Sequence, residues 1–336
     1  MNLTFKTGLK YFFLFLLGIL AVYLVFRGQN QQQIFSEIKN ANYYWVTMSA
    51  TLVLFAHFVR ALRWQMLINA LGKPVKINAT FYALMVGYLA NLAFPRLGEV
   101  SRCGVLTKKV NLSFTQLFGT VITERLIDLL SLLLVTLFTI ALQFQLIFVF
   151  LKQLLQSTTF NFIVFLIVLA SLFILFVLVY WFIKKNDTHK WVIKGLSFLY
   201  DLKKGLSSIL KLKNPWLFVA YTVLIWGLYI SSVYVAFFAL QATSHLGLSA
   251  AFCVIVFASL GMIAPVQGGI GAFHFMVTKA LQFYGISGAS GITLATLMHS
   301  SQTIIIVGFG FLSLFLILRK PRAMGSEPRA FGQRAV

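Results

Sequence analysis

Carboxylate side chains are scarce in this sequence and therefore informative. Only seven Asp and Glu residues occur among 336. Three of them, Glu99, Glu124 and Asp128, lie close together in or beside long apolar segments. An ionisable group at the centre of a membrane costs about 2.5–3.5 kcal/mol on insertion scales, so it is rarely found there without a role. These three acids mark the first candidate site.

Two of the acids share one apolar stretch, VITERLIDLLSLLLV, with Arg125. At about 100° per residue, Glu124, Arg125 and Asp128 fall on one face of a helix, with Asp128 between the other two. If this helix begins near Leu117, Asp128 lies about 16 Å along it, close to the middle of a membrane. Carboxylates one turn apart repel each other, so each needs a cation or a proton.

Several arginines could neutralise these acids. Arg125 could pair with one carboxylate, and Arg96, Arg102 or Arg60 could pair with the other. In one interpretation the cluster handles a substrate. In the alternative it is a structural ion-pair network that only holds helices together.

Basic side chains also recur every third residue near the end of the apolar segment 43–69, at His57, Arg60 and Arg63. We expect Arg63 to extend its guanidinium to the membrane interface. Arg60 lies deeper and is a candidate phosphate ligand, because the planar guanidinium can donate two parallel hydrogen bonds.

Proline and glycine break two of the apolar segments, at 95–99 (PRLGE) and 265–271 (PVQGGIG). Backbone freed at such breaks must be buried in protein or line a wet cavity. Glycine lets the backbone approach a ligand closely, and a helix N-terminus favours an anion. The candidate binding positions at the breaks are Pro95, Arg96, Gly98, Gln267, Gly268, Gly269 and Gly271.

Two histidines and a glutamine follow the second break. His274 comes about one turn later, and His299 and Gln302 lie within the last apolar segment. Each could be a binding group or a packed hydrogen-bonding side chain. A solvated imidazole titrates near neutral pH, so both histidines could also carry a proton.

Composition excludes most soluble functions. The chain is 60% hydrophobic and 10% charged, with a mean hydropathy of +0.88, whereas soluble domains contain about 25% charged residues. The net charge of +21 comes from basic residues in loops and segment ends, which indicates a positive-inside membrane protein contacting anionic lipid instead of a nucleic-acid-binding protein. Cys103 and Cys253 are isolated, and no metal or nucleotide motif occurs, so we expect no metal and no cofactor.

The apolar runs predict an all-α, polytopic helical membrane bundle over residues 1–318. The expected membrane segments are 11–26, 43–69, 78–95, 117–141, 160–183, 215–240, 247–265, 271–284 and 288–318. Leucines at helical spacing predict an amphipathic helix at 190–213 in the headgroup plane. The basic stretch 319–336 lacks periodicity and is predicted to be a disordered cytoplasmic tail.

The basic residues also predict the topology. They place the N-terminus, residues 70–116, residues 184–214 and the tail on the cytoplasmic side. These assignments agree only if 78–116 and 247–284 each enter and leave on one side, the first from the cytoplasm and the second from outside. Two re-entrant, broken helices in an inverted-repeat arrangement are typical of transporters. The alternative is two ordinary kinked spans.

Three motifs resemble those of a known family. The stretch 95–102 (PRLGEVSR) resembles the PxRxGE-plus-Arg signature of the lysylphosphatidylglycerol synthase transmembrane region, also described as a flippase-like domain. The stretch 124–128 (ERLID) resembles its ER-x-x-D motif, and 265–271 resembles its PxPGGxG motif. The resemblance covers about residues 5–318. It implies a helical bundle with re-entrant helices that moves an anionic or aminoacylated phospholipid between leaflets, without the soluble synthase domain.

The sequence departs from the family pattern in its second half. Gln267 stands where the family usually has proline, His274 where an acid is common, and His299 near a position often occupied by arginine. If that acid and arginine normally pair, histidines replace the pair here.

These features predict a lipid transporter, not an enzyme, that places a headgroup phosphate against Arg96, Arg102 or Arg125. Its substrate would be a phospholipid or a polyprenyl-phosphate-type lipid. A membrane-embedded transferase acting on a lipid-linked substrate is one alternative, and a structural or regulatory membrane partner is another. We expect a multi-pass protein of a bacterial cytoplasmic membrane with both termini inside, and a homo-oligomer is compatible with the sequence.

Overall fold

The computed structural model of the chain describes residues 26–107, 109–110, 112–144, 207–264 and 266–318, and the single positions 16, 20 and 23. Most of the predicted first span at 11–26 lies outside the described residues. The predicted span at 160–183 and the tail at 319–336 lie outside them entirely. Of the predicted amphipathic helix at 190–213 only residues 207–213 are described, and Ser207–Lys211 form a short 3-10 helix there.

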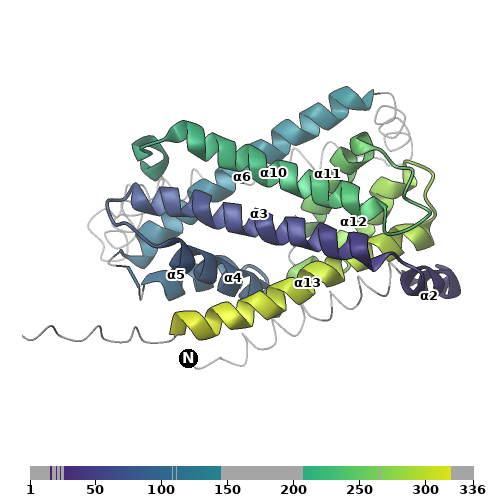
Figure 1. The fold of residues 1–336 in the computed structure, drawn as a ribbon, viewed down its shortest axis with the longest axis horizontal. Helices are drawn as coiled ribbons and strands as arrows, with labels where there is room; N and C mark the ends of the chain where they lie inside the picture. Colours follow the sequence, from purple (N-terminus) through teal and green to yellow (C-terminus); the bar gives the residue numbers. More distant parts are fainter. Residues whose placement is uncertain are drawn as a thin grey trace, which may run out of the picture.

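The described part of the chain is all helical, as predicted (Figure 1). Its helices are α2 (Gln31–Lys39), α3 (Tyr43–Asn69), α4 (Ile77–Ala93), α5 (Leu97–Thr107), α6 (Phe114–Leu142), η1 (Ser207–Lys211), α10 (Pro215–Phe237), α11 (Leu248–Ile263), η2 (Gln267–Gly269), α12 (Ala272–Gln282) and α13 (Gly288–Leu318). By length and composition, α3, α6, α10 and α13 can each cross a membrane. The chain is thus a polytopic helical bundle.

Polar residues fix where the long helices begin. Asn42 caps α3 by accepting a hydrogen bond from the backbone of Tyr44 at 3.1 Å. Ser113 and Gln116 form a reciprocal capping box at the start of α6. Asn214 caps α10, whose first residue is Pro215. Each cap satisfies backbone N–H groups that the first turn of a helix leaves without a partner.

The helices follow one order twice. The first set has lengths of 27, 17, 11 and 29 residues for α3, α4, α5 and α6. The second has 23, 16, 11 and 31 residues for α10, α11, α12 and α13. A long helix, two short helices and a long helix therefore make up each half of the described bundle.

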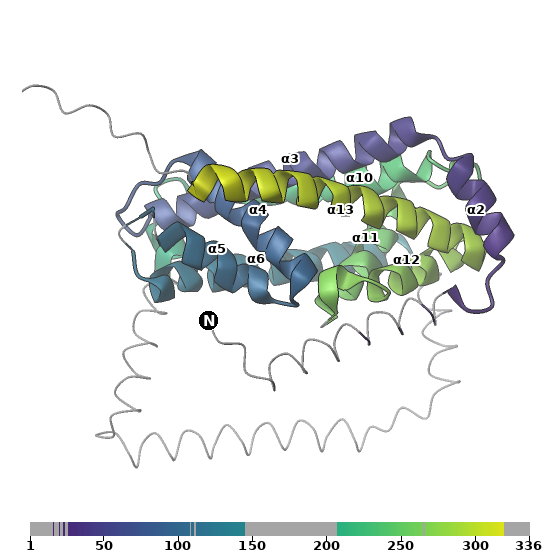
Figure 2. The same ribbon diagram turned by 90° about the horizontal axis from the view of Figure 1, so that it is seen from below.

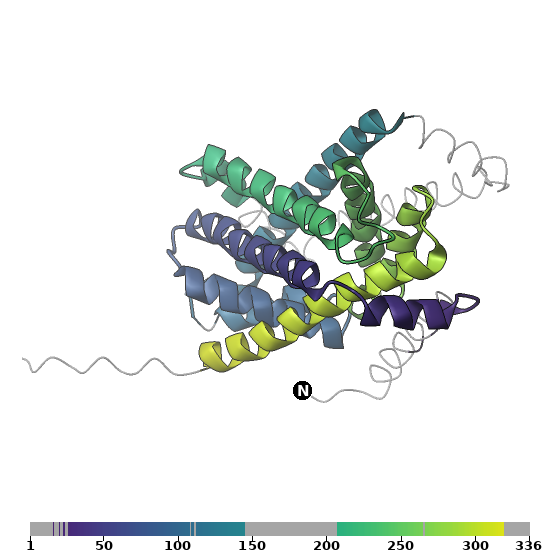
Figure 3. The ribbon, with the colours of Figure 1, turned by 45° about the vertical axis from the view of Figure 1, so that its right-hand side comes forward.

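The two halves run in opposite directions. α3 and α10 lie side by side (Figures 1 and 3). The N–H of Asn42, before α3, donates to the carbonyl of Ala239, after α10, at 2.9 Å. At the other end, Arg63 late in α3 donates to Thr222 early in α10 at 3.2 Å. The pairing of start with end shows that the first helices of the two halves are antiparallel.

In each half the two short helices fold into a hairpin that glycine closes. A Cβ on Gly87 of α4 would lie 2.8 Å from the carbonyl oxygen of Gly98 in α5. A Cβ on Gly261 of α11 would lie 2.9 Å from the carbonyl oxygen of Ala272 in α12. Only glycine permits backbones to approach this closely at these two positions. We call α4–α5 the first hairpin and α11–α12 the second.

The tips of the hairpins meet near the middle of the bundle, as Figure 2 shows. Arg96, at the first tip, donates to the carbonyl of Ile263 at 3.4 Å. Gly268, at the second tip, lies against the side chain of Leu92. The breaks predicted at 95–99 and 265–271 are therefore brought together.

The long helix of each half packs on the hairpin of the other half. In α13, Gly310 packs closely against Leu89 of α4. In α6, Phe138 packs edge-on against Phe252 of α11, with ring centroids 5.2 Å apart. Two apolar cores each combine residues of both halves. The core around Phe237 and Leu281 includes Val46 of α3. The core around Trp64 includes Phe218 of α10 and Ile317 of α13. This exchange of long helices holds the two hairpins in fixed relation.

Replacing Gly87 or Gly261 with alanine should destabilise the protein by about 1–3 kcal/mol, because the added methyl would meet backbone that cannot move aside. Gly104→Ala is the matched control, since nothing lies within 4 Å of a Cβ there. That change should leave stability equal or raise it by about 0.5–1 kcal/mol. Thermal unfolding of the purified variants in detergent measures the difference. Equal stability of all three variants would contradict the close packing described above.

Candidate functional site

Five ionised side chains from three helices form a buried group, which we call the buried ion cluster. Arg60 and Arg63 come from α3, Arg102 from α5, and Glu124 and Asp128 from α6. Glu124 and Arg63 are 0% exposed, and the side chain of Asp128 is 17% exposed. Both predicted intramembrane acids therefore have arginine partners.

Each carboxylate binds more than one guanidinium. Glu124 Oε1 lies 2.5 Å from Arg60 Nε, and Glu124 Oε2 lies 2.9 Å from Arg102 Nη1. Asp128 accepts from Arg60 Nη2 through one oxygen and from Arg63 Nη2 through the other, the latter at 2.6 Å. Three guanidiniums face two carboxylates, so the cluster carries one positive charge in excess when both acids are ionised.

Aromatic and hydroxyl groups enclose the cluster. The guanidinium of Arg102 lies over the Trp64 ring, 4.6 Å from its centroid. The Trp64 indole in turn donates to Thr120 at 2.9 Å. A guanidinium stacked on an aromatic face keeps a favourable electrostatic contact on the side that makes no hydrogen bond. The cluster is thus closely packed, which fits the structural interpretation of these acids.

Two predictions about the arginines were wrong. Arg63 does not reach the interface; it is fully buried and bound to Asp128 and Thr222. Arg125 pairs with neither acid of its own helix and binds Glu99 of α5 instead. Because neighbouring residues point about 100° apart on a helix, Glu124 and Arg125 face different partners.

A second charged group lies at the first tip. We call Arg96, Glu99 and Arg125 the tip cluster. Arg125 Nη2 and Glu99 Oε1 are 2.5 Å apart, with side chains 43% and 22% exposed. Arg96 is exposed at the turn between α4 and α5. The tip cluster carries one net positive charge and, unlike the buried ion cluster, is open to the surroundings.

Arg96 has an unusual backbone. Its φ is 61°, and among the described residues it is the non-glycine residue with a positive φ. L-residues rarely adopt this left-handed conformation, and outliers of this kind are common at functional sites. The first hairpin turns at Arg96, so this unfavourable backbone conformation lies at the tip of the hairpin together with the guanidinium.

The second tip is shaped by glycine, as predicted. Gly268, Gly269 and Gly271 have φ values of 58°, 77° and 82°, and Gly271 directly precedes α12. His299 on α13 reaches this turn, since its Nε2 donates to the carbonyl of Gly268 at 2.8 Å. The His274 ring lies against the His299 ring, with centroids 5.1 Å apart. The tip therefore presents backbone and imidazole groups in place of an ion pair.

The remaining predicted positions divide between the tips and the packing. Gln267 begins η2 at the second tip, and Gln302 is half-buried one turn after His299. Gly98 packs against Gly87 and donates its N–H to Asn91 at 2.7 Å, so it closes the hairpin. Pro95 is half-buried beside Arg96. Within the described residues, no group of three or more His, Cys, Asp and Glu side chains could hold a metal ion.

Trp64 and Thr222 belong to the site but were missed. The sequence signal for these two residues is weak, since an aromatic or hydroxyl residue in an apolar helix has many ordinary roles.

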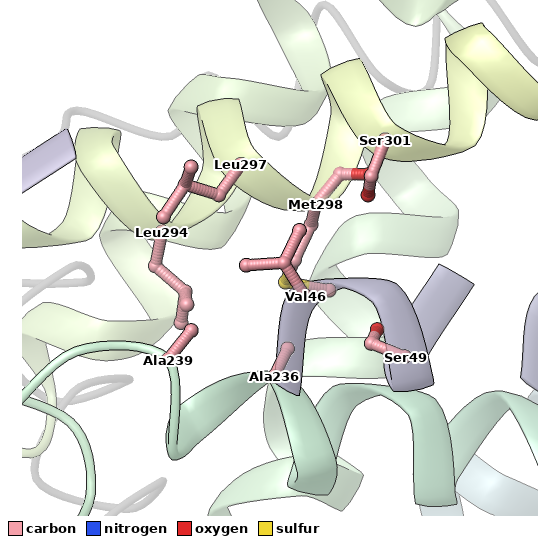
Figure 4. A pocket seen from close by; sticks show the side chains of 8 residues that line it. All are labelled: Val46, Ser49, Ala236, Ala239, Leu294, Leu297, Met298 and Ser301. Carbon is pink, nitrogen blue, oxygen red and sulfur yellow. The ribbon is translucent and has the colours of Figure 1, made fainter. Parts of the chain in front are cut away.

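A small pocket elsewhere is not part of this site. It lies between α3, α10 and α13 (Figure 4) and is lined mainly by apolar side chains such as Leu294 and Met298. It leaves essentially no room for a water-sized molecule, whereas typical ligand sites enclose roughly 300–1,000 Å³.

The two charged groups should respond differently to loss of an acid. Glu124→Gln would leave buried arginines without a counter-charge, and breaking a buried pair typically costs about 3–5 kcal/mol. Glu99→Gln opens a partly exposed pair, for which about 0–1 kcal/mol is expected. The midpoints of denaturant-induced unfolding in detergent compare them. If Glu99→Gln destabilises as much as Glu124→Gln, the two groups are wrongly distinguished.

Comparison with known proteins gives the family. The family described as the lysylphosphatidylglycerol synthase TM region matches residues 11–310. A UPF0104 membrane protein from Methanocaldococcus jannaschii is 28% identical over 210 residues, which are 60% of this chain and 58% of that protein. The match thus spans little more than half of that relative. No solved structure matches the chain. This chain is a multi-pass membrane protein and belongs to the lysylphosphatidylglycerol synthase transmembrane-region family.

Proposed function

We propose that this protein moves a phosphate-bearing lipid, such as an anionic or aminoacylated phospholipid or a polyprenyl-phosphate-type lipid, between the leaflets of a bacterial cytoplasmic membrane. The observation that carries this proposal is the meeting of two hairpins, from oppositely directed halves, at an accessible cationic group. Transporters with inverted repeats bind substrate where broken helices meet. Membership of the family supports a lipid-related role.

Helix lengths support a site at membrane depth. The second helices of the hairpins, α5 and α12, have 11 residues each. At 1.5 Å per residue, such a helix covers about 16 Å, which is half of the roughly 30 Å hydrocarbon core. A hairpin that starts at one face would therefore turn back near the midplane. This argument favours two re-entrant hairpins. The distribution of basic residues favours entry of the first hairpin from the cytoplasm and of the second from outside, with both chain termini inside.

The buried ion cluster and the tip cluster would then have different roles. The buried ion cluster holds α3, α5 and α6 together, and its excess positive charge attracts anions toward the first hairpin. Arg96 and Arg125 of the tip cluster would bind the headgroup phosphate, because arginine forms paired hydrogen bonds to phosphate oxygens. Glu99 would orient Arg125 or receive an amino group of the headgroup. Relative movement of the hairpins would expose this site to each leaflet in turn.

Translocation in liposomes tests the proposal. The purified protein is reconstituted with acyl-labelled phosphatidylglycerol, lysyl-phosphatidylglycerol or a polyprenyl phosphate, and the label in the outer leaflet is quenched chemically. Arg96→Gly keeps the left-handed turn, which glycine adopts freely, and removes the guanidinium. A hydrogen bond to a charged group contributes about 1.5–3 kcal/mol. We therefore expect Arg96→Gly and Arg125→Gln to slow translocation about 10- to 100-fold.

Lys73→Gln is the matched control. Lys73 is an exposed cation in the loop between α3 and α4, so its loss removes the same charge away from the tips and should leave the rate unchanged. The absence of protein-dependent translocation for every lipid would overturn the proposal. Mass spectrometry of the lipids separates the alternatives, since a modified lipid formed from an activated donor would indicate a transferase.

A further inference from the structure

The repeat relates the ion pair of the first tip to the histidine pair of the second. Glu99 is the third residue of α5, and His274 is the third residue of α12. Arg125 lies 11 residues after the first residue of α6, and His299 lies 11 residues after the first residue of α13. Each pair joins the second helix of a hairpin to the long helix that follows it. The second half therefore has two imidazoles where the first half has a carboxylate and a guanidinium.

The hydrogen bonds of His274 and His299 leave one ring nitrogen of each histidine able to accept a proton. The carbonyl of Gly268 can only accept, so His299 must carry its hydrogen on Nε2, 2.8 Å away. In a neutral ring, Nδ1 of His299 is then free to take a proton. Nδ1 of His274 is buried and has no hydrogen-bond partner within the described part of the chain. A buried polar atom without a partner calls for an explanation, and a transferable proton supplies one.

Few charges on the surrounding helices act on the pair. On α12, Lys279 lies beside the Phe275 ring. On α2, Glu37 accepts from Ser290 near the start of α13, about 14 Å along the helix from His299. The other titratable or charged groups on the helices packed against α12, α13 and η2 are Lys39, Tyr43, Tyr44, His57, Arg60, Arg63, Tyr82, Tyr88, Tyr221, Tyr229, Tyr234 and Cys253, with Arg96 at the facing tip. Apart from Glu37, none of these groups is a carboxylate, so within the described part of the chain no fixed negative charge on the packed helices lies next to a proton bound here.

We propose that His274 and His299 form a proton-binding site at the second tip, and that its protonation recruits the phosphate of an anionic lipid to the tips. A protonated pair would give the second half the positive charge that Arg125 gives the first. Proton and phosphate would then bind cooperatively, because the cation cancels the charge of the anion in a medium of low dielectric constant. The inference rests on the proposed lipid transport and adds proton coupling to it.

The direction of the pH dependence follows from this coupling. An unperturbed histidine has a pKa of about 6.5. Above the pKa of the pair, a step that needs one proton should slow by about tenfold per pH unit. Translocation of an anionic lipid should therefore rise as the pH falls from 8 to 5.5. His274→Gln and His299→Gln, which cannot take up a proton, should each flatten this profile.

His245→Gln is the matched control. His245 is exposed in the turn between α10 and α11, so its loss should leave the pH profile intact. His299→Arg supplies a permanent charge at the position related to Arg125 and should make translocation fast and independent of pH. Size-exclusion profiles check that each variant folds. A wild-type rate that does not change with pH, or glutamine variants that keep the wild-type profile, would overturn the inference.

A second measurement does not depend on transport. Histidine-labelled protein in zwitterionic detergent is titrated by NMR from pH 5 to 8, and the signals missing from His274→Gln and His299→Gln identify the pair. Titration of these signals supports the proton site, and its absence overturns it. If no lipid is translocated but the pair titrates, the proposed transport fails while the proton site stands.

Discussion

A charge in an apolar bundle must have a partner, and this constraint governs the first half of the protein. An arginine keeps its proton in a protein interior, so it can be neutralised only by an anion. The described bundle meets this demand by directing arginines of α3 and α5 at two carboxylates of α6. Because the partners come from three helices, the ion pairs fix how those helices pack. The first hairpin is therefore anchored through Arg102.

Close backbone packing has the corresponding role in both hairpins. Gly87 and Gly261 let each short helix lie directly against its partner, so the hairpins are narrow and their turns come to the centre of the bundle. The halves also differ in what they place at those turns. The first has the ion pair of Arg125 and Glu99, whereas the second has imidazoles and glycine backbone. The helices of the two halves are thus arranged with approximate symmetry, but the two tips carry different chemical groups.

The sequence was sufficient to predict the long apolar helices and the breaks, but not α2 or α5, whose residues are too polar to form apolar runs. Long apolar runs gave α3 at Tyr43–Asn69 and α13 at Gly288–Leu318, and proline with glycine gave both turns. The opposed halves were predicted from the distribution of basic residues, and the antiparallel contact of α3 and α10 agrees with that prediction. Helix lengths show the repeat more clearly than residue identity does, since packing preserves length while side chains diverge.

The ion-pair partners could not be predicted. Arg63 and Arg125 were assigned by their distance along a helix, but a buried pair is decided by helix rotation and by contacts between distant segments. Arg63 and Asp128 are 65 positions apart in the chain. The sequence around either residue does not indicate that the two are partners. The predicted cluster was correct in membership for Arg60, Arg102, Glu124 and Asp128 and wrong in the roles of these two arginines.

Exposure distinguishes the buried ion cluster from the tip cluster, and under the proposed function only the tip cluster would handle substrate. A group that binds and releases a ligand must exchange partners many times, and exchange is slow when it first breaks a buried pair worth several kcal/mol. Glu124 shares its two oxygens among three arginines at 0% exposure, so it is unsuited to exchange. Arg125 has one carboxylate partner and is 43% exposed, so a phosphate can displace Glu99 at small cost. Under the proposed function, Glu124 would serve stability and Arg125 transport, from different faces of one helix and a single residue apart.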